Sequence, residues 1–163
     1  MDHSNRLMKK NYIIPPVASW VMVFLGTFGS TAFGQYKDWP HQGTLVLLTT
    51  PDGANLAASA REENFPVLVR LSKETFDFTQ TEAGGTDVRF SANGKPLNYE
   101  VEHWDKDKGE ASIWVRIPEV RGNARQEINL HWGKDGANDE SDGKAVFNDS
   151  NGYAVAMHLG EEL

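Results

Sequence analysis

The chain has 163 residues, in which 23 aspartate and glutamate side chains outnumber 16 lysine and arginine side chains, giving a formal net charge of -7 at pH 7. This acidic balance argues against nucleic acid and anionic membrane surfaces as partners. The sequence contains no cysteine, so it offers neither a disulfide framework nor a lipid-attachment cysteine, and the domain must depend on an ordinary hydrophobic core.

Residues 1–34 have the pattern of a signal peptide. A basic start precedes the apolar run 17–28, and small residues lead to a cleavage site after Gly34. The apolar run is short for a membrane-spanning helix. We therefore predict export to the periplasm, the cell envelope or the extracellular space. The alternative is an uncleaved N-terminal anchor, and the protein would meet the membrane only through such an anchor or through C-terminal segments missing from this sequence.

Residues 35–150 predict one domain built from strands in close succession. Residues 56–63 have helix-forming composition but only about two turns of length, so a connection across the end of a sandwich is preferred. Asn93-Gly94 predicts a tight hairpin turn. Apolar runs and period-two alternation predict strands at 43–50, 65–71, 86–92 and 126–132, in addition to a central hairpin. With the alternation at 76–78 and the apolar segment 153–159, these make about eight short strands and predict an all-β fold, an antiparallel β-sandwich that is jelly-roll-like.

The stretch 97–120 predicts the central hairpin, two alternating strands joined by a short charged turn. We predict a register that sets Glu100 opposite Arg116, a favourable cross-strand charge pair. In this register His103 faces the core and Trp104 lies on the polar face. An odd shift would oppose apolar to polar side chains and is excluded.

Residues 151–163 predict the start of a following strand or domain, because the apolar segment 153–159 begins just before the sequence stops. A domain rarely ends in this way unless the last strand returns to its own sheet. We therefore expect the chain to be an N-terminal fragment of a longer protein.

Several motifs occur together in a characteristic order and spacing. They are Trp39-Pro40, FPVLVRL at 65–71, DVRF at 87–90, Glu102-His103-Trp104, IWVRIP at 113–118 and Trp132-Gly133. Over residues 39–147 the chain resembles a bacterial exported domain of unknown function. That domain is often found just before a concanavalin A-like lectin/glucanase domain and is sometimes fused to MotA/TolQ/ExbB-type proton-channel segments. The resemblance implies export and a multidomain context, and it transfers no catalytic residue.

Glu100 and Glu102 are weak catalytic candidates. With Asn98 they are similar to the strand-borne acid triplet of concanavalin-fold glucanases. Two strand positions span roughly 6–7 Å, close to the carboxyl separation of about 5–5.5 Å in a retaining glycosidase. Asn98 stands where that triplet has its first acid, however, and a solvated strand face is the preferred interpretation.

Trp104, Trp114 and Trp132 are the candidate ligand-binding residues, because a flat indole ring stacks on the apolar face of a sugar. Trp104 and Trp114 are predicted on the polar face of the hairpin, where such a platform would need to lie. The alternative is burial of these rings with the indole N–H satisfied.

The loop 133–143 is rich in oxygen ligands of the kind that calcium takes. Asp139, Glu140 and Asp142 are the candidate metal ligands, supported by Asp135, Asn138 and Asp149. The alternative is a solvated acidic turn, and no cofactor other than Ca²⁺ is expected. The histidines are scattered and form no zinc pattern.

The leading hypothesis is a non-catalytic module of the envelope or the extracellular space that binds a glycan or an envelope protein within a multidomain protein. One alternative is a glycoside hydrolase that uses Glu100 and Glu102. Another is a structural module of a MotA/TolQ/ExbB-type proton-channel complex. Asp87 and Arg89 are expected to form a structural ion pair or hydrogen-bonding group near the rim of the sandwich.

Overall fold

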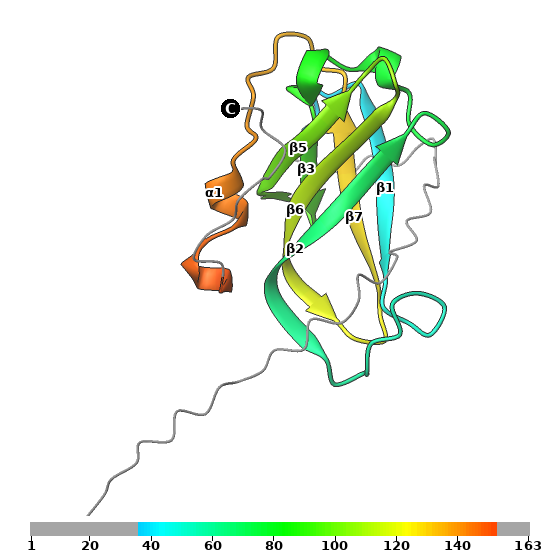
Figure 1. The fold of residues 1–163 in the computed structure, drawn as a ribbon, viewed down its shortest axis with the longest axis vertical. Helices are drawn as coiled ribbons and strands as arrows, with labels where there is room; N and C mark the ends of the chain where they lie inside the picture. Colours follow the sequence, from blue (N-terminus) through cyan, green and yellow to red (C-terminus); the bar gives the residue numbers. More distant parts are fainter. Residues whose placement is uncertain (1–35, 153–163) are drawn as a thin grey trace, which may run out of the picture.

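The structure of the protein, a computed structural model, describes residues 36–152, and Figure 1 shows their fold. The predicted signal peptide at 1–34 and the predicted strand at 153–159 lie outside the described residues. The strands are β1 (His41–Leu48), β2 (Arg61–Ser72), β3 (Arg89–Ala92), β4 (Lys95–Leu97), β5 (Tyr99–Asp105), β6 (Glu110–Arg121) and β7 (Arg125–Trp132).

These strands form two sheets that pack face to face (Figure 1). The four-stranded sheet has the order β1-β7-β3-β4 and the three-stranded sheet the order β2-β6-β5. Every paired neighbour is antiparallel. The predicted all-β antiparallel sandwich is thus confirmed.

Helices are few and short in the described part of the chain. They are the 3-10 helices η1 (Phe78–Gln80), η2 (Ala83–Gly85) and η3 (Asp149–Asn151) and the α-helix α1 (Gly143–Val146). Residues 56–60 form a connection, as preferred for the stretch 56–63, but residues 61–63 belong to β2, which begins at Arg61 and pairs with β6 from there. Across residues 36–152, no helix has the length and apolar character needed to cross a membrane.

The core lies between the two sheets and follows the period-two alternation of the strands. On β6, alternate residues from Ala111 to Ile117 are at most 4 % exposed. On β3 and just before it, Phe90 and Val88 lie on the core side and are fully buried. Each such side chain contributes about 1.5–3 kcal/mol when it leaves water, so the alternation fixes which face of each strand points inward.

The Asn93-Gly94 turn forms as predicted. Both residues have positive φ, 52° and 74°, and Ala92 pairs with Lys95 across the turn. Two successive positive φ angles define the tight hairpin turn that Asn-Gly favours. The chain then passes from β4 in the four-stranded sheet to β5 in the three-stranded sheet, so Leu97 belongs to a different strand from the hairpin in which it was predicted.

The predicted register of the central hairpin is wrong by two residues. Glu100 pairs with Trp114 instead of Arg116, and a bulge follows between Val101 and His103. Alternation is satisfied equally well by registers that differ by two residues, so it could not choose between them.

The bulge also corrects the predicted faces of two side chains. An extra residue in one strand turns the rest of that strand over relative to its partner. His103 is therefore exposed, whereas Trp104 packs against the core. Both placements are the reverse of those predicted from strict alternation.

Residues 141–152, which we call the strap, lie along the outer side of the three-stranded sheet, where Figure 1 shows α1 beside β5. The backbone N–H of Val101 donates to Ser141 Oγ at 2.9 Å, and the N–H of Asp142 donates to the carbonyl of Tyr99 at 2.9 Å. Val146 of the strap is itself fully buried. The guanidinium of Arg116 donates to the Ala145 carbonyl. The strap is therefore an integral part of the domain.

Candidate functional site

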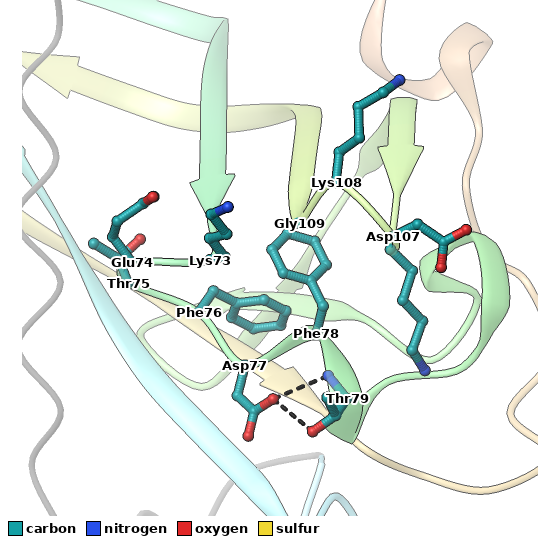
Figure 2. A pocket seen from close by; sticks show the side chains of 11 residues that line it. Lys73, Glu74, Thr75, Phe76, Asp77, Phe78, Thr79, Asp107, Lys108 and Gly109 are labelled. Atoms are coloured by element: carbon teal, nitrogen blue, oxygen red, sulfur yellow. Dashed lines mark hydrogen bonds between the residues drawn. The ribbon is translucent and has the colours of Figure 1, made fainter.

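A pocket of about 420 Å³ opens at one end of the sandwich. It is lined by residues 73–79, which follow β2 and lead into η1, and by residues 106–109, the turn between β5 and β6. Figure 2 shows these two segments facing each other. The pocket is therefore built from segments far apart in the sequence, at the place where the ends of the strands meet.

Aromatic rings form the floor of the pocket and the wall behind it. Phe76 and Phe78 are 4 % and 5 % exposed and make an edge-to-face contact at 5.0 Å. Trp104 packs on Phe78 at 5.3 Å, and Trp132 packs on Phe76 at 5.0 Å. The structure thus brings together two of the three predicted tryptophans, but as packing behind the pocket.

An acidic side chain at the rim is held in a fixed position. Asp77 Oδ1 accepts hydrogen bonds from the backbone N–H of Thr79 at 3.0 Å and from its hydroxyl at 2.6 Å, as Figure 2 shows. These bonds lower the pKa of Asp77. The carboxylate is therefore ionised at neutral pH, and its second oxygen points away from Thr79 (Figure 2).

Basic side chains complete the rim. The ammonium of Lys106 donates to the Thr81 carbonyl at 2.6 Å, and that of Lys108 pairs with Asp105 at 2.7 Å. Gly109 has φ of 71°, and a Cβ there would lie 2.7 Å from Cβ of Lys73. The close approach of these two segments requires glycine at this position. The pocket therefore combines ammonium and carboxylate groups above an apolar floor.

None of these pocket residues was predicted from the sequence to bind a ligand. The available signals were the alternation Phe76-Asp77-Phe78 and the charged turn that follows β5. Neither segment predicts a site by itself, because each is an ordinary strand end or turn. Their approach across the end of the sandwich follows only from the pairing of β2 and β5 with β6.

Trp114, Glu100 and Glu102 lie together on the outer face of the three-stranded sheet. The indole N–H of Trp114 donates to Glu102 Oε2 at 3.1 Å, and its ring contacts Phe147 of the strap at 5.5 Å. A Cβ on Gly143 would lie 2.3 Å from Glu100 Oε1. The strap therefore lies directly against one of the two candidate carboxylates.

The three candidate metal ligands are directed to separate partners. Glu140 Oε2 lies 3.0 Å from Arg89 Nε, and Asp139 Oδ1 accepts from the N–H of Ser141. Asp142 Oδ1 caps α1 by accepting from the N–H groups of residues 144 and 145. Within residues 36–152 no three His, Cys, Asp or Glu side chains gather into a group that could hold a metal ion.

Asp87 and Arg89 are the most deeply buried charged side chains of the described residues, at 0 % and 1 % exposure. The Asp87 carboxylate accepts from the backbone N–H groups of Glu82 at 3.0 Å and Gly133 at 2.7 Å. It therefore ties the η1–η2 segment to the end of β7. The expected hydrogen-bonding role near the rim is confirmed, and the ion-pair partner of Arg89 is Glu140.

An aromatic segment before β1 packs against this buried pair. The indole N–H of Trp39 donates to the Asp87 carbonyl at 2.8 Å. The same ring has Arg89 Cζ at 5.3 Å and Lys134 Nζ at 4.4 Å from its centroid. Cations so placed are attracted to the face of the indole. Trp39 is thus anchored by both its edge and its face.

Two other ionisable side chains near Arg89 are held uncharged. Burial lowers the pKa of His131 to about 4, and its Nε2 lies 3.0 Å from Ser91 Oγ. Burial also raises the pKa of Tyr99 to about 12, and its hydroxyl accepts from Arg89 at 3.0 Å. This end of the four-stranded sheet is therefore a packed polar cluster with structural hydrogen bonds.

One family model matches part of the chain. Residues 84–154 match the family model described as Domain of unknown function (DUF2341). The match runs from η2 through β7 and the strap, so it includes the 106–109 side of the pocket and leaves out the 73–79 side. It supports the resemblance in its coarse form, a domain of unknown function. No curated protein and no solved structure matches the chain.

Proposed function

We propose that this protein is a non-catalytic binding module that recognises a glycan through the pocket at the end of the sandwich. The observation that carries the proposal is the fixed carboxylate of Asp77 and the fixed ammonium of Lys106 beside the floor of Phe76 and Phe78. Small-molecule sites combine an apolar lining with a few well-placed polar groups in this way.

The chemistry of the rim suits a sugar. A hydroxyl donates to a carboxylate and accepts from an ammonium, so neighbouring hydroxyls can satisfy both groups at once. Phe76 and Phe78 are 4 % and 5 % exposed, so a sugar would contact only the edges of their rings, and the polar rim carries the recognition. The predicted signal peptide at 1–34 supports a location in the envelope or the extracellular space, where glycans are abundant.

A glycoside hydrolase that uses Glu100 and Glu102 has less support. The strap lies against Glu100, and Trp114 holds Glu102 through its indole N–H. A hydrolase needs both carboxyl groups to flank a substrate in an open cleft. Binding of an envelope protein and a structural role in a MotA/TolQ/ExbB-type complex have no specific contact of the described residues in their favour.

The test is a glycan array followed by titration of the full chain, with and without calcium. Asp77→Asn keeps the cap on Thr79 but removes the charge, and a hydrogen bond to a charged group is stronger than one to a neutral group. We expect this variant to bind at least tenfold more weakly. Asp139→Asn is the matched control, because Asp139 also accepts a bond from the N–H two residues on but lies outside the pocket; its affinity should be unchanged.

A folded chain that binds no glycan would exclude the proposal. Equal affinity of Asp77→Asn and Asp139→Asn would exclude this pocket as the site. Loss of binding on calcium removal would contradict a site made by the pocket alone and would support calcium binding by Asp139, Glu140 and Asp142. Release of sugar from a glucan, abolished by Glu100→Gln with Glu102→Gln, would establish the hydrolase instead.

A further inference from the structure

We infer that the pocket takes the uncharged end of a saccharide, about one or two sugar units long, and not the interior of a long chain. This inference rests on the proposed function. It concerns the size, charge and attachment of the ligand, none of which follows from glycan binding alone.

The pocket is small and lies at one end of the sandwich. Its volume of about 420 Å³ is near the low end of the roughly 300–1,000 Å³ found for small-molecule sites. Residues 73–79 and the turn at 106–109 stand on opposite sides of it (Figure 2). The space between the two segments therefore holds only a short ligand.

The outer face of the three-stranded sheet, along which a polysaccharide could lie, is partly covered by the strap. A polysaccharide chain bound along its length needs an extended platform of exposed rings. Trp114, on the outer face of the three-stranded sheet, packs against Phe147 of the strap instead. Trp104 and Trp132 pack behind the floor of the pocket. The predicted tryptophans therefore form no continuous platform within the described residues.

The pocket has no surplus of positive charge with which to bind an anionic sugar. The pocket carries three basic residues (Lys73, Lys106, Lys108) and three acidic residues (Glu74, Asp77, Asp107), so 3 − 3 leaves no net charge. The whole chain is acidic, with a formal charge of -7. An anionic polysaccharide would need a surplus of basic groups to overcome that repulsion. An uncharged sugar uses the same groups as separate donors and acceptors.

The experiment is calorimetric titration of the full chain with neutral gluco-, manno-, galacto- and xylo-oligosaccharides, each from monosaccharide to hexasaccharide, and with an oligouronate. We expect the affinity to level off at the disaccharide and the oligouronate to bind at least tenfold more weakly. With a long neutral polymer, the bound protein should follow the number of chain ends. Asp77→Asn should lower the plateau affinity at least tenfold, and Asp139→Asn should leave it unchanged.

Affinity that keeps rising to the hexasaccharide, binding that follows total sugar, or preference for the oligouronate would overturn this inference and leave the proposed function standing. Absence of binding to every saccharide by a folded chain would overturn the proposed function itself. The two failures are therefore distinguishable in one set of titrations.

Discussion

The buried guanidinium of Arg89 forms an ion pair with the exposed carboxylate of Glu140. Arg89 Nε lies 3.0 Å from Glu140 Oε2, and the two side chains are 1 % and 57 % exposed. The contact has ion-pair distance but lacks the alignment of a hydrogen bond. The same guanidinium donates to the carbonyls of Val88 and Asn138, both at 2.6 Å. One buried guanidinium therefore ties the loop after β7, through the Asn138 carbonyl, to the residues just before β3, through the Val88 carbonyl.

This asymmetry predicts unequal effects of removing either partner. Arg89→Met leaves buried carbonyls without a donor and should lower the free energy of unfolding by about 1–3 kcal/mol for each carbonyl left unsatisfied. Glu140→Gln removes only an exposed charge and should cost about 1 kcal/mol or less. Urea unfolding of both variants checks this. Equal losses would show that the ion pair, and not the carbonyl bonds, fixes the loop.

Gly85 should tolerate a side chain far less well than its neighbour. Gly84 and Gly85 have φ of 69° and 67°, but a Cβ on Gly85 would lie 2.5 Å from the Trp104 ring, whereas one on Gly84 meets nothing within 4 Å. Gly84→Ala should cost about 1–2 kcal/mol from backbone strain, and Gly85→Ala about 1–3 kcal/mol more. Thermal unfolding measures both, and tryptophan fluorescence should change only for Gly85→Ala. Identical behaviour would mean that Trp104 is not packed there.

Stability should fall with acid through His131. Its pKa is lowered from 6.5 to about 4 in the folded state, so between these values the unfolded state binds more protons. Above pH 6.5 the imidazole is neutral in both states and does not lower the free energy of unfolding. As the pH falls from 6.5 to 4, the free energy of unfolding decreases by roughly 3 kcal/mol. Urea unfolding from pH 7.5 to 4 should show a shallower loss for His131→Gln than for the natural chain. Parallel curves would contradict the assignment.

Asp87 should control the loop that carries η1 and η2. In Asp87→Asn one backbone N–H, of Glu82 or Gly133, faces an amide donor where it now meets a carboxylate oxygen. An unsatisfied buried donor costs about 1–3 kcal/mol. Hydrogen exchange at the amides of Glu82 and Gly133 should accelerate, while that of Val115 in β6 reports only global unfolding. Unchanged exchange at both loop amides would show that the carboxylate does not hold them.

The fold class can be predicted from the sequence because every strand must turn its apolar side chains toward the core, which produces the same period-two alternation in each. Alternation along β6 places Ile113 and Val115 in the core without any tertiary information, and Asn93-Gly94 fixes its own turn by conformational preference. The register of β5 on β6 cannot be predicted from this alternation. The bulge before His103 adds a residue on one strand, and local composition carries no clear mark of it.

The candidate site was less predictable than the fold. Trp104 was expected on the polar face, and the bulge turned it toward Phe78. Arg89 and Glu140 are 51 residues apart in sequence, so no local pattern predicts their contact. The pocket between 73–79 and 106–109 depends in the same way on strand pairing, and it becomes visible only once β2 and β5 are both placed beside β6.

The bonds from the strap to Tyr99 and Val101 also cover part of an exposed sheet edge. β5 is the last strand of its sheet, and a strand in that position offers unpaired backbone groups to which a strand from another molecule can add. Ser141 and Asp142 take up two of those groups. A chain cut before Ser141 would present a bare template for intermolecular sheet growth, and we expect such a truncation to aggregate.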